Sequence, residues 1–387
     1  MALNILIGAD LVPTESNYHL FNQGAVAELI GADLQTKLAQ CDFSIFNLEA
    51  PITDVKEPID KCGPNLIIPT SCIEGIKAIN PHFFTLANNH ILDHGSQGLF
   101  STMEILEKNG ICYAGVGRNL DEAKEPFILE KGGVKIGVYC CAEHEFSIAT
   151  ESTPGVNPFD ALESLDHISD LKKECDYVIV LYHGGKEHYR YPSPYLQKVC
   201  RKIVDKGADL VVCQHSHCIG CCEEWNAGTI VYGQGNFLFD DCDNEFWNTS
   251  LLIDLNIEKK NGVIKTSLSY IPLAKSANKV RLAKTEKDVI LSQFRERSNQ
   301  ISDSEFVEKR YDEFAQRMLN QYLYSLIGKT SRRFLFRVIN KLSGYRYGRS
   351  ILNRKYDKRS VLSLINYIEC EAHRELFQQG LHSKLKE

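Results

Sequence analysis

The chain has 387 residues, of which 43% are hydrophobic and 24% are charged, and this predicts a globular protein with one large domain and an appendage. Its formal net charge of -6 at pH 7 argues against a general nucleic-acid binder. The start, MALNILIGAD, lacks the basic region and apolar run of a signal peptide. No stretch of about 18 apolar residues offers a bilayer span. We therefore expect a cytoplasmic protein that reaches a membrane only by docking at its surface.

Short apolar runs alternate with amphipathic stretches through the first 217 residues. Between the runs, apolar residues recur at intervals of three and four, which predicts helices over residues 25–40, 96–110 and 194–208. Strands that alternate with helices of this length indicate βαβ units, an α/β fold and a largely parallel sheet. The predicted strands cover residues 3–10, 41–50, 82–90, 134–144, 176–185 and 209–217.

The rest of the chain changes character twice. Residues 250–273 predict two antiparallel strands, because an Asn-Gly pair at 261–262 favours a tight turn between them. From about residue 276 the strand pattern stops, and residues 301–329 predict an amphipathic helix that begins at a Ser or Asp cap. We therefore predict two domains, one over residues 1–275 and a basic, mainly helical region over residues 276–387.

Positive charge is concentrated in residues 329–359, which hold eleven Lys or Arg residues and one acidic residue, with aromatic residues between them. One interpretation is a solvated basic face on a small helical subdomain. The other is a surface that docks onto anionic lipid head groups or an anionic polymer. No nucleic-acid-binding module is recognisable, so we expect no nucleic acid as partner. The candidate docking residues are Arg332, Arg333, Arg337 and Lys341.

The 14 cysteines lack the regular spacing of a disulfide framework, so we expect reduced thiols. One cluster, formed by Cys213, Cys218, Cys221 and Cys222, contains a single CxxC motif. Zinc or iron–sulfur ligation needs four ligands, and the sequence has no second CxxC motif to supply them. Packing as small apolar side chains is therefore the favoured interpretation.

Polar side chains follow the predicted strands at the points where the strands end. In open α/β sheets, ligands bind outside the carboxyl ends of the strands. Carboxylate oxygens, amide oxygens and imidazole nitrogens together suit a divalent ion such as Mn, Zn or Fe(II). A set of six suits two ions that share a bridging carboxylate. The candidate metal ligands are Asp10, Glu49, Asn89, His183, His215 and His217.

Taken singly, each of these residues has an ordinary structural explanation. Asp10 suits a turn or a helix cap, Glu49 a solvated loop, and Asn88 with Asn89 a plain turn. The two imidazoles of the HxH motif share a face only while the strand is extended. The metal hypothesis rests on the coincidence of all these residues at equivalent positions along the chain.

The order of these residues resembles the CapA family, which is linked to poly-γ-glutamate capsule formation and is a branch of the calcineurin-like metallophosphoesterases. The resemblance covers roughly residues 3–273. It implies an α/β fold of four layers, an αββα sandwich of two sheets flanked by helices, followed by a helical C-terminal extension. The matching motifs are Gly8-Ala9-Asp10, Asn47-Leu48-Glu49, Asn88-Asn89-His90 with Asp93, His183-x-Gly185-x-Glu187, His215-x-His217 and Gly235-Asn236-Phe237.

The resemblance also implies how the candidate ligands divide between two ions. Glu49 would bridge the ions. The other ligands of the first ion would be Asp10 and His217. The other ligands of the second ion would be Asn89, His183 and His215.

Further motif residues would serve the chemistry around the ions. His90 would face the leaving group as a general acid, or would stabilise negative charge there, and Asp93 would orient it. Glu187, Asn88 and Asn236 would fix the ligands by hydrogen bonds from behind them.

Some positions depart from the family and superfamily patterns. The phosphoesterase pattern opens with Asp-x-His, whereas Leu11 and Val12 follow Asp10 here, so the first ion lacks a ligand. Gln214 replaces the usual glycine before the HxH motif, and His188 replaces a tyrosine. Two interpretations of His188 are open, an exposed residue or an extra ligand or acid. Whether the protein holds one ion or two is therefore left open.

Two classes of function fit this sequence. One is a divalent-metal-dependent hydrolase that cleaves phosphoester or γ-amide bonds during synthesis of a capsule or surface polymer, with an anionic polymer or a phosphorylated small molecule as substrate. The other is a non-catalytic partner that keeps the fold and binds the nascent polymer or a membrane-bound synthase complex. The missing Asp-x-His histidine favours the second class, whereas the motif that contains His90 favours the first, which we expect.

Overall fold

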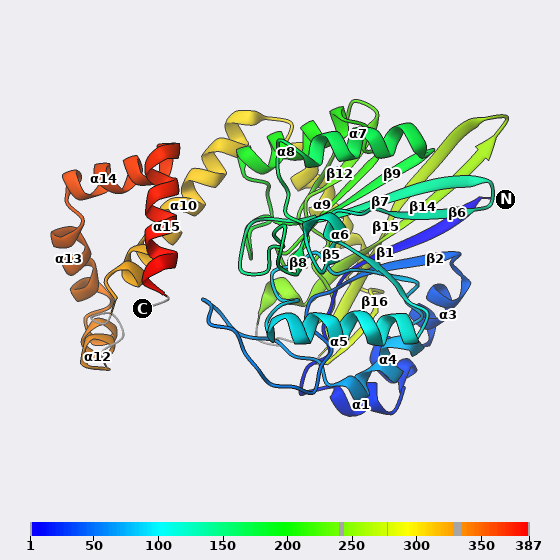
Figure 1. The fold of residues 1–387 in the computed structure, drawn as a ribbon, viewed down its shortest axis with the longest axis horizontal. Helices are drawn as coiled ribbons and strands as arrows, with labels where there is room; N and C mark the ends of the chain where they lie inside the picture. The colour runs from blue at the N-terminus through cyan, green and yellow to red at the C-terminus, as the bar shows by residue number, and fades with distance from the viewer. Residues whose placement is uncertain (1, 240–243, 277, 329–333, 386–387) are drawn as a thin grey trace. The chain divides into compact units, whose positions relative to one another are not determined.

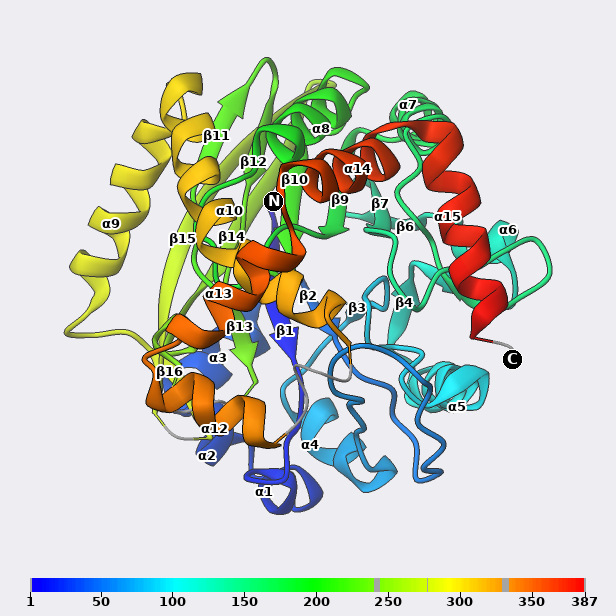
Figure 2. The same cartoon turned by 90° about the vertical axis from the view of Figure 1, so that its left-hand side faces the viewer.

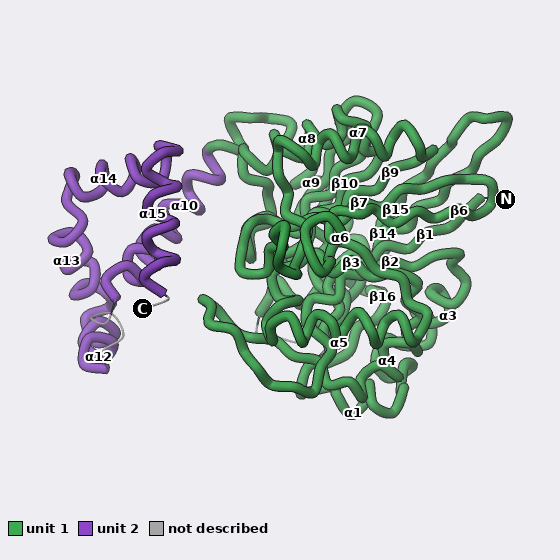
Figure 3. Tube along the Cα trace, viewed as in Figure 1, with its two compact units in different colours: residues 1–308 green, residues 309–387 purple. Residues whose placement is uncertain are grey.

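The structure is a computed structural model that describes residues 2–239, 244–276, 278–328 and 334–385 (Figure 1). The chain folds into two compact units, residues 1–308 and residues 309–387 (Figure 3). The expected division of the chain into domains at residue 275 stays a prediction.

The first unit contains an eight-stranded sheet in the order β16-β15-β14-β1-β2-β3-β4, with β13 also paired to β1. Strands β1, β2, β3, β4 and β13 run parallel to one another, whereas β14, β15 and β16 are antiparallel. The strands are β1 (Leu3–Leu11), β2 (Phe43–Leu48), β3 (Phe83–Thr85), β4 (Cys112–Ala114), β13 (Asn236–Leu238), β14 (Thr249–Lys260), β15 (Val263–Ser276) and β16 (Lys279–Leu282).

A second sheet of six strands has the order β11-β12-β10-β9-β7-β6, and its central strands are also parallel. In the turned view, β9, β10 and β7 of this sheet lie above β1, β2 and β3 of the first sheet (Figure 2). A short pair of strands, β5 (Val116–Gly117) and β8 (Gly155–Val156), forms a third ribbon. The strands of the second sheet are β6 (Phe127–Lys131), β7 (Val134–Ala142), β9 (Tyr177–His183), β10 (Leu210–Gln214), β11 (Cys222–Trp225) and β12 (Gly228–Val231).

The two sheets pack face to face, and helices cover their outer faces (Figure 1). In β9, Ile179 and Leu181 belong to the core between the sheets, whereas Val178 and Val180 pack under α7 (Ser164–Glu174) and α8 (Pro194–Asp205). Burial on both faces explains why such strands read as continuous apolar runs. The predicted αββα sandwich is therefore confirmed. The helices on the first sheet are α1 (Tyr18–Asn22), α2 (Val26–Ile30), α3 (Ala32–Gln40), α4 (Ile73–Ala78) and α5 (Gly95–Lys108).

The local structure differs from the expected elements in two places. The single helix expected over residues 25–40 is two helices, because Gly31 adopts φ +76 between α2 and α3 and so ends the first one. A further strand, β16, follows residue 276 and pairs with β15. The hairpin turn is confirmed: Asn261 and Gly262 have φ 54 and 78, which is the left-handed backbone that a two-residue turn of this type requires.

After β16, helix α9 (Lys287–Gln300) packs on the first unit, and Phe294 lies with its ring 4.7 Å from that of Tyr270. The next helix, α10 (Ser304–Leu326), begins where Asp303 accepts a hydrogen bond from the backbone of Glu305, as the expected cap does. The later helices of the second unit are α12 (Phe334–Leu342), α13 (Arg346–Lys355), α14 (Lys358–Glu369) and α15 (Glu371–Lys384).

Of the candidate docking residues, Arg337 and Lys341 lie exposed on α12. Arg332 and Arg333 lie outside the described residues. Within the described part of the chain, no helix is both long enough and apolar enough to cross a bilayer.

A close approach between β1 and β2 generates a prediction. The ring of Phe46 occupies the space where a side chain on Gly8 would lie, two residues before Asp10. Gly8→Ala should therefore lower the free energy of unfolding of the first unit by about 1–3 kcal/mol. Urea unfolding followed by tryptophan fluorescence measures this, because Trp225 and Trp247 both lie in the first unit.

The matched control is Gly380→Ala in α15, where an added Cβ meets nothing within 4 Å. This change should leave the fluorescence transition where it is. An unchanged transition in Gly8→Ala would show that β1 and β2 can separate without loss of packing.

Candidate metal centre

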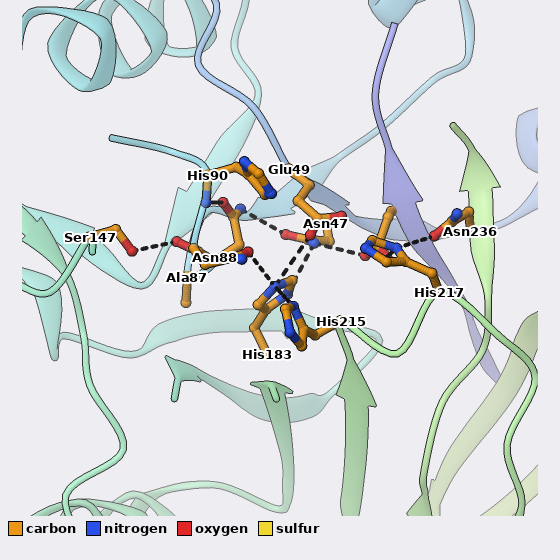
Figure 4. Close-up of polar contacts among 12 residues, drawn as sticks. Asn47, Glu49, Ala87, Asn88, His90, Ser147, His183, His215, His217 and Asn236 are labelled. Atoms are coloured by element: carbon orange, nitrogen blue, oxygen red, sulfur yellow. Dashed lines mark hydrogen bonds and ion pairs between the residues drawn. The ribbon is translucent and has the colours of Figure 1, made fainter. Parts of the chain in front are cut away.

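The candidate site lies where the central strands of both sheets end. The register of the first sheet sets Asp10 opposite Asn47 of β2 and opposite Asn236 of β13. Glu49 follows β2 directly, and His183 is the last residue of β9. Figure 4 shows the side chains of these strand ends pointing toward one another.

The first group of donor atoms surrounds Nε2 of His183. This nitrogen lies 3.1 Å from Oδ1 of Asn89, 3.1 Å from Nδ1 of His215 and 3.4 Å from Oε1 of Glu49. The donor atoms of Glu49, His183 and His215 all lie within 4.8 Å of one another, and the three residues are buried. Two facing imidazoles beside a carboxylate match the donors that Mn, Zn or Fe(II) accept.

The second group consists of Asp10, Glu49 and His217, which are also buried with their donor atoms within 4.8 Å of one another. Nδ1 of His217 lies 3.3 Å from Oδ2 of Asp10. Glu49 belongs to both groups. The structure thus brings all six candidate ligands together and divides them as the resemblance implies; their role as ligands stays a prediction.

The two histidines of the HxH motif belong to different donor groups, and both have an uncommon backbone conformation. β10 ends at Gln214, and His215 and His217 then adopt φ 82 and 52. Positive φ is uncommon for residues other than glycine and is concentrated at functional sites. The two imidazoles therefore do not share one face of an extended strand; each turns to a different donor group.

The burial of Glu49 shows that a cation fits here. Its side chain is fully buried, and neither carboxylate oxygen receives a hydrogen bond from any described residue. Oδ2 of Asp10 is buried without a hydrogen bond in the same way. A buried carboxylate without compensation costs several kcal/mol. Burial, geometry and donor chemistry together fit one or two divalent metal ions.

The charges of three groups around Glu49 follow from burial and from their charged neighbours. Burial alone would lower the pKa of His217, but the negative charges of Glu49 and Asp10 outweigh it and raise the pKa to about 9. Burial would raise the pKa of Asp10, but the nearby imidazole of His217, with that of His183 and the hydrogen bond from Asn47, outweighs it and lowers that pKa. Burial keeps the pKa of His215 well below its usual value, so this imidazole is neutral.

A second ring of side chains holds the candidate ligands. Asn47 donates to Oδ1 of Asp10 at 2.8 Å and accepts from Asn88 at 3.0 Å. Ser147 donates to the backbone carbonyl of Asn88 at 2.8 Å, and Asn236 lies with Oδ1 2.8 Å from Nδ1 of His217 (Figure 4). Asn88 and Asn236 are therefore brought to the site. Asn47 and Ser147 were not expected, although Asn47 opens the Asn-Leu-Glu motif.

Glu187 is not brought to the site. Its side chain is exposed, and among the described residues no hydrogen bond joins it to His183 or His215. His188 lies outside both donor groups: its Nε2 accepts a hydrogen bond from Trp247 at 3.0 Å, and its ring stacks on Phe246 at 5.3 Å.

His90 lies beside the donor groups and is held by Asp93, whose Oδ2 is 2.6 Å from Nδ1 of the imidazole. Lys61, which the sequence pattern did not single out, contacts Oδ1 of Asp93 and lies 3.1 Å from the same imidazole nitrogen. The side chain of Lys61 is only 2% exposed although the surrounding loop is largely exposed. The three side chains form one polar group, in which Lys61 and Asp93 are buried and His90 is half-buried.

A small cavity beside the first donor group adds two unexpected acids. Asn89, Glu143, Glu145, His183 and His215 line this cavity. Glu143 accepts a hydrogen bond from the backbone of Gly185, and burial raises the pKa of its carboxyl. These acids follow β7, whose predicted strand carried no motif that would have marked them.

The cysteine cluster does not belong to these groups. Cys213, Cys218 and Cys221 are buried, and Sγ of Cys213 lies 3.5 Å from Sγ of Cys200. Among the described residues, the groups suited to a metal contain no cysteine. Cys213 and Cys221 pack into the core of the second sheet and its helices. Burial raises the pKa of the Cys218 thiol to about 11.

Comparison with known proteins identifies the family of this chain. The profile of the family described as "Bacterial capsule synthesis protein PGA_cap" matches residues 5–241. This match spans more than half of the chain and includes every candidate ligand. The chain belongs to this family.

Curated relatives include the "Capsule biosynthesis protein CapA" of Bacillus anthracis, 31% identical over 213 residues, which are 52% of this chain and 52% of the relative. The "PGA biosynthesis protein CapA" of Bacillus subtilis is 30% identical over 241 residues, 60% of this chain and 62% of the relative. The chain thus spans little more than half the length of these curated relatives. Among solved structures, a putative 5'-nucleotidase from Staphylococcus aureus has a TM-score of 0.47 and 14% identity, covering 76% of this chain and 58% of that chain.

Because the charge of Glu49 is buried, Glu49→Gln should change the free energy of unfolding, relative to wild type, in opposite directions without and with metal. Without metal, Glu49→Gln should raise the free energy of unfolding by about 1 kcal/mol, because it removes an uncompensated buried charge. With Mn²⁺ or Zn²⁺ added, wild-type protein should gain about 3 kcal/mol at a hundredfold excess over Kd, and the variant should gain far less. Thermal unfolding in chelator and in metal measures both.

The matched control is Glu258→Gln on the exposed end of β14. It should behave like wild type in both conditions. An undiminished metal-induced gain in Glu49→Gln would remove Glu49 from the ligands.

The two donor groups should bind metal with different pH dependence. Below about pH 9, His217 carries a proton in the metal-free protein, and an ion must displace it. The affinity of the Asp10 and His217 group should therefore fall about tenfold for each pH unit below that value. The group that contains neutral His215 should show a shallower dependence. Calorimetric titration with Mn²⁺ between about pH 6.5 and 8.5 measures both slopes, and equal slopes would contradict the assignment.

Proposed function

We propose that this protein acts in the biosynthesis of a capsule or surface polymer of the poly-γ-glutamate type, as a divalent-metal-dependent hydrolase of phosphoester or γ-amide bonds. Its substrate would be an anionic polymer or a phosphorylated small molecule, and its partner a membrane-bound synthase complex. The family and the names of its relatives support the biological process. The observation that supports hydrolysis is the imidazole of His90, held by Asp93 at the edge of the donor groups.

The proposed ligands are Asp10, Glu49, Asn89, His183, His215 and His217, for one or two ions of Mn, Zn or Fe. When bound, such ions supply Lewis-acid activation of water and of the attacked group. Asn47, Asn88 and Asn236 keep the ligand side chains in place by hydrogen bonds.

In this proposal His90 transfers the proton. Its Nδ1 faces the Asp93 carboxylate at 2.6 Å, which makes that nitrogen the donor and leaves Nε2 to exchange a proton with a leaving group. The backbone N–H of His90 donates to Asn88, so the general acid and the ligand support are parts of one hydrogen-bonded chain. Lys61 contacts the other oxygen of the Asp93 carboxylate and thereby fixes its orientation.

One observation favours the alternative of a non-catalytic binding partner. Where the superfamily pattern has the Asp-x-His histidine, Leu11 and Val12 are buried apolar side chains with exposures of 0% and 2%. The first ion therefore has one protein ligand fewer, and the alternative function needs only that a polymer or a synthase binds, without hydrolysis. A hydrolysis assay separates the two functions.

The test is turnover of metal-loaded protein on a phosphodiester and on poly-γ-glutamate. His90→Asn should lower kcat by about 100- to 10,000-fold, because it removes the proton donor, while metal content stays unchanged. His19→Asn, at an exposed histidine of α1, is the control and should keep wild-type turnover. Equal turnover of His90→Asn and wild type would exclude His90 from the chemistry. Polymer binding without hydrolysis of either substrate would establish the alternative.

A further inference from the structure

Helix α12 in the second unit presents three different faces. Its inner face is anchored to the same unit: the ring of Phe336 lies 6.2 Å from that of Tyr324 and 5.9 Å from that of Tyr347. Asn340, one turn later, accepts a hydrogen bond from the backbone of Gly348 at 2.9 Å. These contacts fix which residues of the helix face outward.

The outward face is a continuous apolar stripe. Its members recur at intervals of about four, so they form one line along the helix. The two residues at its first end and the one at its last end are more than 70% exposed, which is a large exposure for leucine and phenylalanine. The stripe consists of Phe334 (78% exposed), Leu335 (71%), Val338 (36%), Ile339 (44%) and Leu342 (83%).

The flank of the stripe is cationic. Arg337 and Lys341 lie one turn apart on α12, and α13 continues the positive charge. Residues 334–359 hold eight Lys or Arg residues, all exposed, and one acidic residue. Within the described residues, no ion pair neutralises any of the eight. The six that follow Arg337 and Lys341 are Arg346, Arg349, Arg354, Lys355, Lys358 and Arg359.

A cavity of about 510 Å³ opens beside this flank, within the second unit. Among the described residues, its lining includes Tyr324, Phe334, Arg337, Lys341 and Tyr345. Two cations and two phenols around one hollow are donors that suit a phosphate oxygen. The hollow thus lies next to both the cations and the apolar stripe.

We propose that α12 and α13 form a docking surface for an anionic phospholipid bilayer. Apolar side chains that insert, beside cations that remain at the head groups, are the combination by which a helix lies in a membrane interface. A second copy of the chain would set like charge against like charge. A neutral apolar partner would leave the cations without a role. This proposal does not depend on hydrolysis, so its test and the turnover assay fail independently.

The test is co-sedimentation of the full-length protein with phosphatidylcholine vesicles that contain or lack phosphatidylglycerol. Wild type should bind the anionic vesicles at low salt and be released as salt rises, because the attraction is screened within a Debye length of about 8–10 Å. Arg337→Gln with Lys341→Gln should weaken the partition coefficient about 30-fold. The matched control, Lys287→Gln with Arg295→Gln on exposed positions of α9, should leave it unchanged.

A second variant tests the stripe. Leu335→Ser with Leu342→Ser changes two side chains that are already largely exposed, so the fold should survive, and binding should weaken about tenfold or more. Circular dichroism and thermal unfolding verify that each variant is folded. Absence of binding to anionic vesicles at low salt would overturn the proposal. Equal binding to neutral vesicles would contradict the proposed contact between the cations and anionic head groups. Self-association that depends on the stripe would identify a second copy of the chain as the partner of the stripe.

Discussion

The site depends on one buried charge that the protein itself does not neutralise. Glu49 is fully buried at the end of β2, and no described residue donates a hydrogen bond to either of its oxygens. A protonated imidazole beside it is that of His217, whose raised pKa reflects the charges of Glu49 and Asp10. Because several kcal/mol oppose such burial, the fold around Glu49 has to hold it in place by other contacts.

The contacts that hold Glu49 in place lie outside the site, in the packing of the sheets and helices. Continuous apolar strands pack between the sheets and under the helices, and their carboxyl ends deliver the polar side chains to one place. The same constraint explains the backbone of the HxH motif. His215 and His217 adopt positive φ because one stretch of chain must present donors to two groups that share Glu49. Stability in the core thus permits strain at the site.

The sequence predicted the strands, the αββα sandwich and the side chains that meet at the strand ends, because each depends on a short local pattern. It did not predict Lys61 or Glu143, since their role arises from a fold that brings distant segments together. Lys61 reaches Asp93 only because the backbone of Ile59 and that of Leu66 both hydrogen-bond to Asp93. No periodicity in an exposed loop marks such a lysine. The helix break at Gly31 was missed because apolar spacing continues on both sides of it.

The charges around the site bear on both functions that the fold allows. Without metal, Asp10 and Glu49 outnumber the single protonated imidazole of His217, and the nearby cavity adds Glu143 and Glu145. Coulomb repulsion therefore opposes a phosphate or a polyglutamate chain at this edge of the sheets. Two divalent ions in the donor groups would cancel this negative charge and remove the repulsion. An anionic polymer would then meet the ions on one side and the group formed by Lys61, Asp93 and His90 on the other. Metal is thus needed for a non-catalytic polymer-binding protein as much as for a hydrolase, and loss of polymer binding on metal removal is not by itself a sign of catalysis.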